Sequence, residues 1–191
     1  MESVEWTKLV EAAQNDDHRA FEELVRRTYA DTYTLAFRLT SNEEDARDVV
    51  QETYIRAHSG LKRFRSDAQF TTWLYRITAN CANTYLGRRV RTRLEPLPDD
   101  YVIPDERSTH DPQHRADLSV QQAELTKALA LLPPKLRSVI VLRDIYDLSH
   151  ESISEELGIS PTAAKVRLHR ARKRLKDSLY TVGTQEDNRA V

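Results

Sequence analysis

Cationic side chains crowd the stretch from Lys165 to Lys176, which contains no acidic residue. The stretch holds Lys165, Arg167, Arg170, Arg172, Lys173, Arg174 and Lys176. Guanidinium and ammonium groups gathered in one short segment neutralise phosphates, so they predict contact with a nucleic acid. The residues before this stretch, from Leu148 to Pro161, are typical of a short helix, a tight turn and the start of a second helix. A helix-turn-helix with this charge pattern indicates double-stranded DNA as the ligand.

The turn residues support this prediction. Ser149 can cap the first helix by accepting a hydrogen bond from a free backbone N–H. Gly158 stands where the chain needs a positive φ to leave that helix. Ser160 can cap the second helix, and Pro161 suits its first position because no N–H is needed there. Apolar side chains would close the corner and form a buried stripe on the second helix: Ile153, Leu157 and Ile159, then Ala164, Leu168, Ala171, Leu175 and Leu179.

A basic amphipathic helix also suits two other roles, a solvated helix face and a helix that binds a protein partner. The two caps with a glycine between them favour the helix-turn-helix over both. Lys165, His169 and Arg172 would lie opposite the apolar stripe, with Arg170 and Arg174 beside them. This one-sided charge also favours DNA binding.

A second group of residues, between positions 61 and 93, interleaves aromatic rings with cations, a combination that binds single-stranded DNA through base stacking and phosphate contacts. We expect Phe70 and Trp73 in the core, because they share a helical stripe with Ile77. Phe64 precedes that helix and is the better stacking candidate. The other side of the helix carries groups that can bind phosphates or read the edge of an exposed base: Thr72, Arg76, Asn80 and Asn83.

The helix expected before this group has an acidic side. Acids in its first turn, Glu43 to Asp45, are explained by the positive end of the helix dipole. Asp48, Gln51 and Glu52 lie too far along the helix for that explanation. They predict a face that docks on another protein.

Composition limits the possible classes of protein. The 191 residues include four glycines, 31% charged residues and a net charge of −1, which favours one or two small helical domains. The near-zero net charge hides local patches, since residues 62–93 contain one acid, Asp67, and eight cations: Lys62, Arg63, Arg65, Arg76, Arg88, Arg89, Arg91 and Arg93. We expect a cytoplasmic protein without a membrane span or a secretion signal, and its one cysteine, Cys81, is expected as a buried thiol.

The pattern of apolar residues predicts an all-α chain of two small helical domains joined by an extended linker. The domains are expected at 1–94 and 119–180, with an acidic, proline-rich linker at 95–118 and a tail at 181–191. Helices are expected at residues 4–14, 17–39, 41–58, 69–88, 118–131 and 134–145, before the helix-turn-helix. Ser41 is expected to start the third helix through a capping box. Tyr29 is expected to point inward from the second.

Four stretches, in this order, resemble bacterial RNA polymerase sigma factors of the small, extracytoplasmic-function type. They are Asp45-Ala-Arg-Asp-Val-Val-Gln-Glu-Thr-Tyr, Phe70-Thr-Thr-Trp-Leu-Tyr-Arg-Ile-Thr-Ala-Asn, Leu131-Leu-Pro-Pro-Lys-Leu-Arg-Ser-Val-Ile-Val-Leu-Arg, and Leu148 to Lys176 with Arg167-Leu-His-Arg-Ala-Arg. The resemblance covers about residues 10–95 and 120–178. It implies a region 2-like first domain and a region 4-like second domain.

The resemblance also implies roles for particular residues. The acidic helix would dock on the coiled coil of the largest polymerase subunit through Asp48, Gln51 and Glu52. The promoter −10 element would be captured as flipped, single-stranded bases by Lys62, Phe64, Arg65, Arg76, Asn80, Arg88 and Arg89. The −35 duplex would be bound by Pro161, Thr162, Lys165, Val166, Arg167, His169 and Arg170, and the second domain would touch the polymerase flap. An anti-sigma factor is a further expected partner.

One stretch departs from the family pattern. Small sigma factors often have Gly-Thr-Val-Lys-Ser-Arg in the recognition helix, where this chain has Thr162-Ala163-Ala164-Lys165-Val166-Arg167. Ala163 and Val166 therefore replace hydrogen-bonding side chains with apolar ones, which can contact thymine methyl groups or simply pack. The family pattern consequently does not specify which −35 sequence this chain reads.

Two other classes of protein are alternatives to a promoter-specificity subunit. A helix-turn-helix regulator that binds duplex DNA without polymerase would explain residues 131–176 but would leave the acidic helix and the residues 61–93 without a role. A nucleic-acid enzyme or metal protein would need a reactive or metal-binding cluster. His110 and His114 are four positions apart with Asp111 between them, but they lie in a proline-rich linker and not on a helix. No other ligand cluster accompanies them, so we expect no metal, cofactor or catalytic residue.

Overall fold

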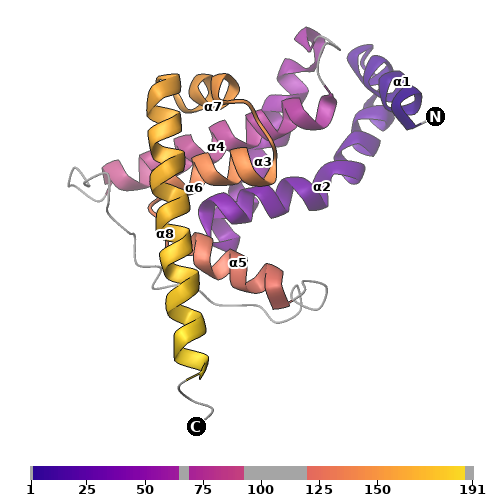
Figure 1. Ribbon diagram of the computed structural model, residues 1–191. Helices are drawn as coiled ribbons and strands as arrows, with labels where there is room; N and C mark the ends of the chain where they lie inside the picture. The colour runs from indigo at the N-terminus through magenta and orange to yellow at the C-terminus, as the bar shows by residue number, and fades with distance from the viewer. Residues whose placement is uncertain (1, 65–68, 93–119, 188–191) are drawn as a thin grey trace.

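The computed structural model describes residues 2–64, 69–92 and 120–187, and its regular secondary structure is entirely helical (Figure 1). The predicted all-α fold is therefore confirmed. The linker predicted at 95–118 lies outside the described residues. Within the described part of the chain, no helix is long and apolar enough to cross a membrane.

In the first domain, the described residues form four helices and a short 3₁₀ turn, in the order α1 (Glu2–Gln14), α2 (His18–Thr40), α3 (Glu43–Gly60), η1 (Leu61–Arg63) and α4 (Phe70–Thr92). The bounds of each α-helix agree to within a few residues with those predicted from the apolar periodicity of the sequence. Asp17 caps α2 by accepting hydrogen bonds from the N–H groups of Arg19 and Ala20.

Two details of this domain differ from the prediction. Asn42, and not Ser41, caps α3, because Ser41 has a left-handed φ of 58° and ends α2. Tyr29 is 49% exposed and does not point inward. The buried stripe of α2 passes instead through Thr28 and Thr32, whose hydroxyls donate to backbone carbonyl groups one turn earlier, at 2.7 and 2.8 Å. This bonding allows polar threonines to be buried where the pattern favoured an aromatic ring.

The second domain has the order α5 (Val120–Ala130), α6 (Pro134–Ile140), η3 (Val141–Ile145), α7 (His150–Leu157) and α8 (Pro161–Asp187). The helix predicted at 134–145 is interrupted, since η3 is a π-helical turn in which the N–H of Tyr146 donates to the carbonyl of Val141. In Figure 1, α8 extends well beyond the rest of the molecule, and it continues past residue 180, the predicted end of the domain.

The helix-turn-helix has the predicted caps. The hydroxyl of Ser149 accepts a hydrogen bond from the N–H of Ser152 at 3.1 Å, and that of Ser160 accepts one from the N–H of Ala163 at 3.1 Å. Gly158 ends α7 with a φ of 61°. Ala164, Leu168 and Ala171 form the buried stripe of α8.

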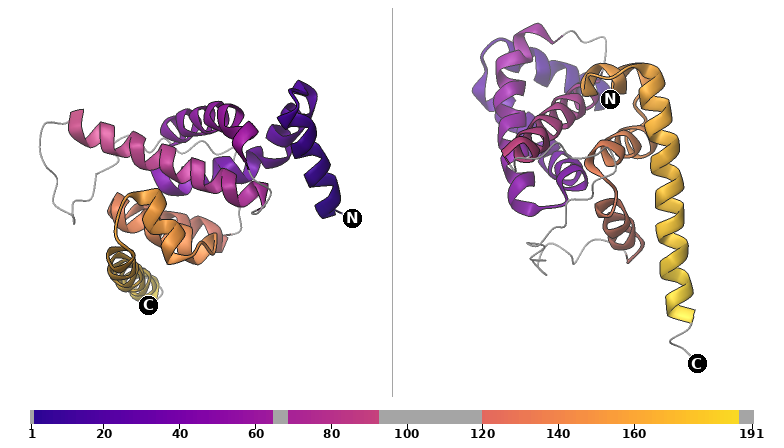
Figure 2. Two further views of the ribbon diagram at one scale, coloured as in Figure 1. Left: turned by 90° about the horizontal axis from the view of Figure 1, so that it is seen from above. Right: turned by 90° about the vertical axis from the view of Figure 1, so that its left-hand side faces the viewer.

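The two domains pack against each other. Helix α2 contacts α5 and α6, and α4 contacts α6 and α7, which lies beside it in both views of Figure 2. A single apolar cluster contains buried residues of both domains, among them Leu39 of α2, Ala82 of α4 and Val139 of α6. A smaller cluster at the other end of the first domain joins α1, α2 and α4. The shared cluster places α7 directly over part of α4, and this arrangement shapes the candidate sites below.

Candidate functional site

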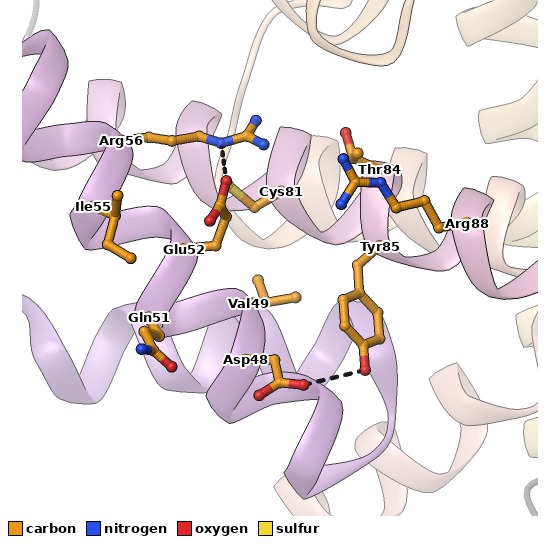
Figure 3. Close-up of a pocket in the computed structure, with 10 residues that line it drawn as sticks. All are labelled: Asp48, Val49, Gln51, Glu52, Ile55, Arg56, Cys81, Thr84, Tyr85 and Arg88. Carbon is orange, nitrogen blue, oxygen red and sulfur yellow. Dashed lines mark hydrogen bonds and ion pairs between the residues drawn. The ribbon is translucent and has the colours of Figure 1, made fainter.

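A groove of about 290 Å³ runs between α3 and α4 (Figure 3). It contains all three residues that the sequence assigned to protein docking, Asp48, Gln51 and Glu52. Asp48 and Gln51 are exposed, and Glu52 is half-buried. The complete lining is Asp48, Val49, Gln51, Glu52, Ile55, Arg56, Cys81, Thr84, Tyr85 and Arg88. The groove therefore combines an acidic rim with apolar side chains, which suits a protein surface that carries cations around an apolar centre.

Hydrogen bonds across this groove hold its acids in place. The hydroxyl of Tyr85 lies 3.0 Å from an oxygen of Asp45 and 3.3 Å from one of Asp48, and it donates to these carboxylates. Burial, together with these neighbouring carboxylates, raises the pKa of Tyr85 to about 12, so its hydroxyl remains a donor at neutral pH. Nε of Arg56 donates to Glu52 at 2.6 Å. Of the two acids that line the groove, Asp48 is exposed and Glu52 is half-buried, so Asp48 offers the more accessible negative charge.

Cys81 forms part of the floor of the same groove. Its side chain is buried, as the sequence predicted, and burial raises the pKa of its thiol. A protonated, buried thiol is a poor nucleophile, so the structure favours a packing role for Cys81.

The residues assigned to the −10 element do not form one cluster. Lys62 forms an ion pair with Asp16 at 2.8 Å, and Arg88 lines the α3–α4 groove. Phe64 lies outside α4, as predicted, but its ring packs on Trp73 and Phe70, with ring centroids 4.9 and 6.0 Å apart. Arg65, and the side chain of Arg89, lie outside the described residues.

Arg76 and Asn80 lie together on α4, and the second domain contacts this face at Arg76. Nη2 of Arg76 donates to the hydroxyl of Ser152 at 2.6 Å. Nε of Arg76 is buried and has no hydrogen-bond partner within the described residues. Asn80, one turn further along α4, is exposed. Local sequence patterns could not predict this contact, because Arg76 and Ser152 are 76 positions apart.

The residues assigned to duplex DNA do form one surface. Six of the seven are exposed on the first turns of α8, and one of these six, Val166, is 45% exposed despite being apolar. The exposed side chains of this surface are Pro161, Thr162, Lys165, Val166, His169 and Arg170, with Arg167 half-buried at its edge. Arg172 differs, since its guanidinium is paired with Asp144 through two hydrogen bonds of 2.9 and 2.6 Å.

No group of histidine, cysteine, aspartate and glutamate side chains that could hold a metal ion occurs in the described ranges. The two linker histidines, His110 and His114, lie outside those ranges.

Comparison with known proteins decides the family. Residues 24–92 match the family Sigma-70 region 2, and residues 122–175 match the family Sigma-70, region 4. RNA polymerase sigma factor YlaC of Bacillus subtilis is 32% identical over 85% of this chain and 94% of its own length. This chain belongs to the sigma-70 family and is of the ECF type.

Other relatives of this sigma factor agree. ECF RNA polymerase sigma factor SigE of Mycolicibacterium smegmatis is 39% identical over 84% of the chain, although the matched part spans only 62% of SigE. RNA polymerase sigma-H factor of Pseudomonas aeruginosa is 32% identical over 90% of the chain and 92% of its own length. The sigma factor is therefore a promoter-specificity factor of RNA polymerase.

Solved structures show the same fold. The sigma factor CnrH, in complex with the cytosolic domain of CnrY, matches with a TM-score of 0.59 and 28% identity over 92% of this chain and 97% of CnrH. RpoE of Bartonella quintana, in complex with the anti-sigma factor NepR, has the same TM-score with 23% identity over 84% of this chain and 96% of RpoE.

Proposed function

We propose that this sigma factor binds core RNA polymerase through the α3–α4 groove and grips promoter DNA at two places. Helix α8 would bind the −35 element as duplex, and the Arg76 and Asn80 face of α4 would capture bases of the −10 element as a single strand. The factor would have no reaction of its own. The observation that carries this proposal is the groove, with its exposed Asp48 and Gln51 on one rim.

The groove has the chemistry of a docking site for a helical protein surface. Ile55 is an apolar side chain that is 55% exposed at one end, while Asp48 provides a charge held by Tyr85. An apolar contact flanked by a fixed charge gives both affinity and orientation. The coiled coil of the largest polymerase subunit is the surface that we expect there.

For the −35 element, α8 offers both kinds of contact that duplex recognition needs. Lys165 and Arg170 can neutralise phosphates, which sets affinity and orientation. Val166 is an exposed apolar side chain between them in sequence, and it suits contact with a thymine methyl group in the major groove. The buried side of α8 fixes these residues relative to the rest of the domain.

For the −10 element, contacts between the protein and a captured base would offset the free energy of unstacking that base, which is a few kcal/mol. Asn80 has an amide that can read a base edge, and Arg76 can hold the adjacent phosphate. Phe64 can contribute only if its ring leaves Trp73, so we assign the first role to Asn80 and Arg76.

A regulator that binds duplex DNA without polymerase remains the alternative function. It would account for α7 and α8 but gives no role to the groove on the opposite domain. No contact in the described residues favours it over the polymerase-dependent function.

We also propose an anti-sigma factor as a second protein partner. CnrH, the related structure with 28% identity, was solved with the cytosolic domain of CnrY bound. The α3–α4 groove is the surface where such a partner would compete most directly with polymerase.

The test of polymerase binding is a charge reversal in the groove, Asp48→Lys. A lysine at this position would face the cations of the polymerase surface, and we expect an affinity loss of about tenfold or more. Binding to immobilised core enzyme and promoter-dependent transcription are the two measurements. Asp31→Lys on the exposed part of α2 makes the same charge change away from the groove and should bind normally. Equal affinity of both variants would contradict the proposal, and wild-type protein that selects no promoter would favour the duplex-only regulator.

A further inference from the structure

Helix α1 reaches the junction between α3 and α4, although it lies outside residues 24–92, the part of the chain that matches Sigma-70 region 2. Nε2 of Gln14, the last residue of α1, donates hydrogen bonds to the carbonyl of Leu61 at 3.0 Å and to that of Phe64 at 2.8 Å. Leu61 begins η1, and Phe64 follows its last residue. One side chain thus binds both ends of η1.

These two bonds fix the point at which the chain leaves the helical conformation. Phe64 is extended, with a ψ of 122°, and its N–H donates to the carbonyl of Leu61 at 3.0 Å. The last carbonyl groups of a helix have no donor further along the same helix, and a primary amide has two N–H groups to offer. Gln14 can give one N–H to each carbonyl. It therefore holds both the end of η1 and the direction in which the chain continues.

An ion pair joins the same two segments. Asp16, two residues after Gln14, has a left-handed φ of 64°, and its carboxylate accepts a hydrogen bond from Nζ of Lys62 at 2.8 Å. Both side chains of the pair are exposed, and exposed ion pairs add little stability. We therefore attribute the attachment chiefly to Gln14, which is half-buried. The pair also compensates the charge of Lys62, which the sequence assigned to −10 DNA.

Aromatic packing attaches α1 to the other side of the junction. Trp6 stacks on Phe70, the first residue of α4, with ring centroids 6.3 Å apart, and Trp73 of α4 packs on Phe64. Residues of α1, η1 and α4 belong to one buried apolar cluster: Val10, Ala13, Leu61, Phe70 and Leu74. Helix α1 therefore contacts the described residues on both sides of positions 65–68. Arg76 follows Phe70 by fewer than two helical turns.

We infer that Gln14 is a positioning residue for −10 recognition: through the carbonyls of Leu61 and Phe64 it fixes the α3–α4 junction, the end of the −10 face that precedes Arg76. This inference rests on the proposed capture of −10 bases by α4. Gln14 acts through the backbone of η1 and not by contact with DNA. A junction that is ordered before binding loses less conformational entropy when it takes up a strand, so fixing it raises affinity and limits the bases that fit.

The first test removes the two donors with little change of shape. Gln14→Met in the polymerase-bound factor should broaden the −10 preference in transcription from a promoter library randomised at that element. It should also lower the affinity of this complex for a single-stranded oligonucleotide of the preferred −10 sequence by about threefold or more. Affinity for core enzyme and for −35 duplex should stay unchanged.

Asn15→Ala is the matched control for this test. It removes the neighbouring amide, which donates only within α1 and its turn, to the carbonyl of Glu11 at 2.9 Å. This variant should select −10 sequences as wild type does. If Gln14→Met also selects as wild type does, or if Asn15→Ala broadens the preference equally, the inference is wrong.

A second comparison separates positioning from a general loss of stability. Val139→Ala removes two buried methyl groups from α6 of the other domain. It should lower the free energy of unfolding in urea at least as much as Gln14→Met does, yet leave −10 selectivity unchanged. Equal loss of selectivity in both variants would show that instability alone is responsible, and the inference would be overturned.

Tryptophan fluorescence reports on the junction directly, because both tryptophans of the chain, Trp6 and Trp73, pack against this apolar cluster. In the free factor, Gln14→Met should make their emission easier to quench with acrylamide, while Asn15→Ala and Val139→Ala should not. Unchanged quenching in Gln14→Met would show that the junction is held without Gln14, and the inference would be wrong.

A last comparison separates this inference from the proposed function. Asn80→Ala in the polymerase-bound factor should also change −10 selectivity. If it does while Gln14→Met does not, −10 capture by α4 stands and positioning by Gln14 is wrong. If Gln14→Met changes selectivity and Asn80→Ala does not, the junction itself reads the strand, so positioning stands and the role of Asn80 is wrong. If neither variant changes selectivity, both ideas fail.

Discussion

Individual arginines on α8 have different roles although their types and spacing look alike. Arg170 is exposed and has no acidic partner within the described residues, so its charge is available to a phosphate. Arg172, two positions later, is held by two hydrogen bonds to Asp144, and its charge is already compensated. The sequence placed both on or beside the DNA-facing side of the helix. The structure assigns Arg172 to holding α8 against η3.

This difference gives a prediction at the residue scale. Arg170→Ala should reduce the slope of log affinity for −35 duplex against log salt by about 1, because one phosphate contact is lost. Arg172→Ala should leave the slope unchanged and lower the free energy of unfolding by at most about 1 kcal/mol, as for a surface ion pair. Duplex titrations at several salt concentrations and urea unfolding measure the two effects. A smaller slope in Arg172→Ala would show that it, too, contacts DNA.

Single elements of this fold are defined mostly by their ends. The α7–α8 turn has a serine cap on each helix and one residue, Gly158, with a φ of 61°. A Cβ at Gly158 would meet no atom within 4 Å, so a substitution there tests the backbone conformation and not packing. Because this turn sets the angle between α7 and α8, its conformation determines how the duplex-binding face is presented.

Gly158→Ala should therefore lower the free energy of unfolding by about 1–2 kcal/mol, the cost of a left-handed alanine. Gly60→Ala is the matched control. Gly60 has a φ of −89°, and a Cβ there would make ordinary contact with Trp73 at 3.4 Å. This control should be neutral or stabilising by up to about 1 kcal/mol, since alanine restricts the unfolded chain. Chemical unfolding measures both, and equal losses would contradict the assignment of strain to Gly158.

At the scale of the whole molecule, a buried cation connects the two domains. It lies on neither of the two candidate DNA-binding faces. Arg137 of α6 donates to the carbonyl of Leu39 at 3.2 Å and to the hydroxyl of Ser41 at 2.5 Å, both at the end of α2. Its other terminal nitrogen donates to the carbonyls of Ala130 and Leu132. A positive charge at the carboxyl end of α2 also interacts favourably with the helix dipole. Arg137 thus connects the first domain, α5 and α6 at a single point.

At this scale we expect the two domains to unfold together. Arg137→Met leaves several buried carbonyl groups without donors and should lower the free energy of unfolding by about 3 kcal/mol. In calorimetry, the wild-type chain should unfold in a single transition, and the Arg137→Met variant should unfold in two. Arg143→Met, which removes one hydrogen bond to Leu148 within the second domain, should cost only about 1 kcal/mol and keep one transition. Two transitions in the wild-type chain would show that the domains are not coupled.

The sequence predicted the helices well because their signals are local. Apolar spacing and caps depend on residues within a few positions of one another, and the serine caps at 149 and 160 and the turn at Gly158 formed as expected. The errors were at Ser41 and Tyr29, where a left-handed residue and two buried threonines changed the pattern. The π-helical turn at η3 was missed because no local residue type specifies it.

The candidate sites also differ in whether local sequence patterns could predict them. The sequence by itself determined the α8 surface, since its members share one face of one helix, and it grouped the acidic residues Asp48, Gln51 and Glu52, which share a side of α3. Only the tertiary structure decided that Arg76 bonds to Ser152 of α7, that Arg172 is neutralised by Asp144, and that Arg137 joins the domains. These pairs are 28 to 98 positions apart. Contacts at such separation depend on how whole helices pack, and helix periodicity contains no information about that packing.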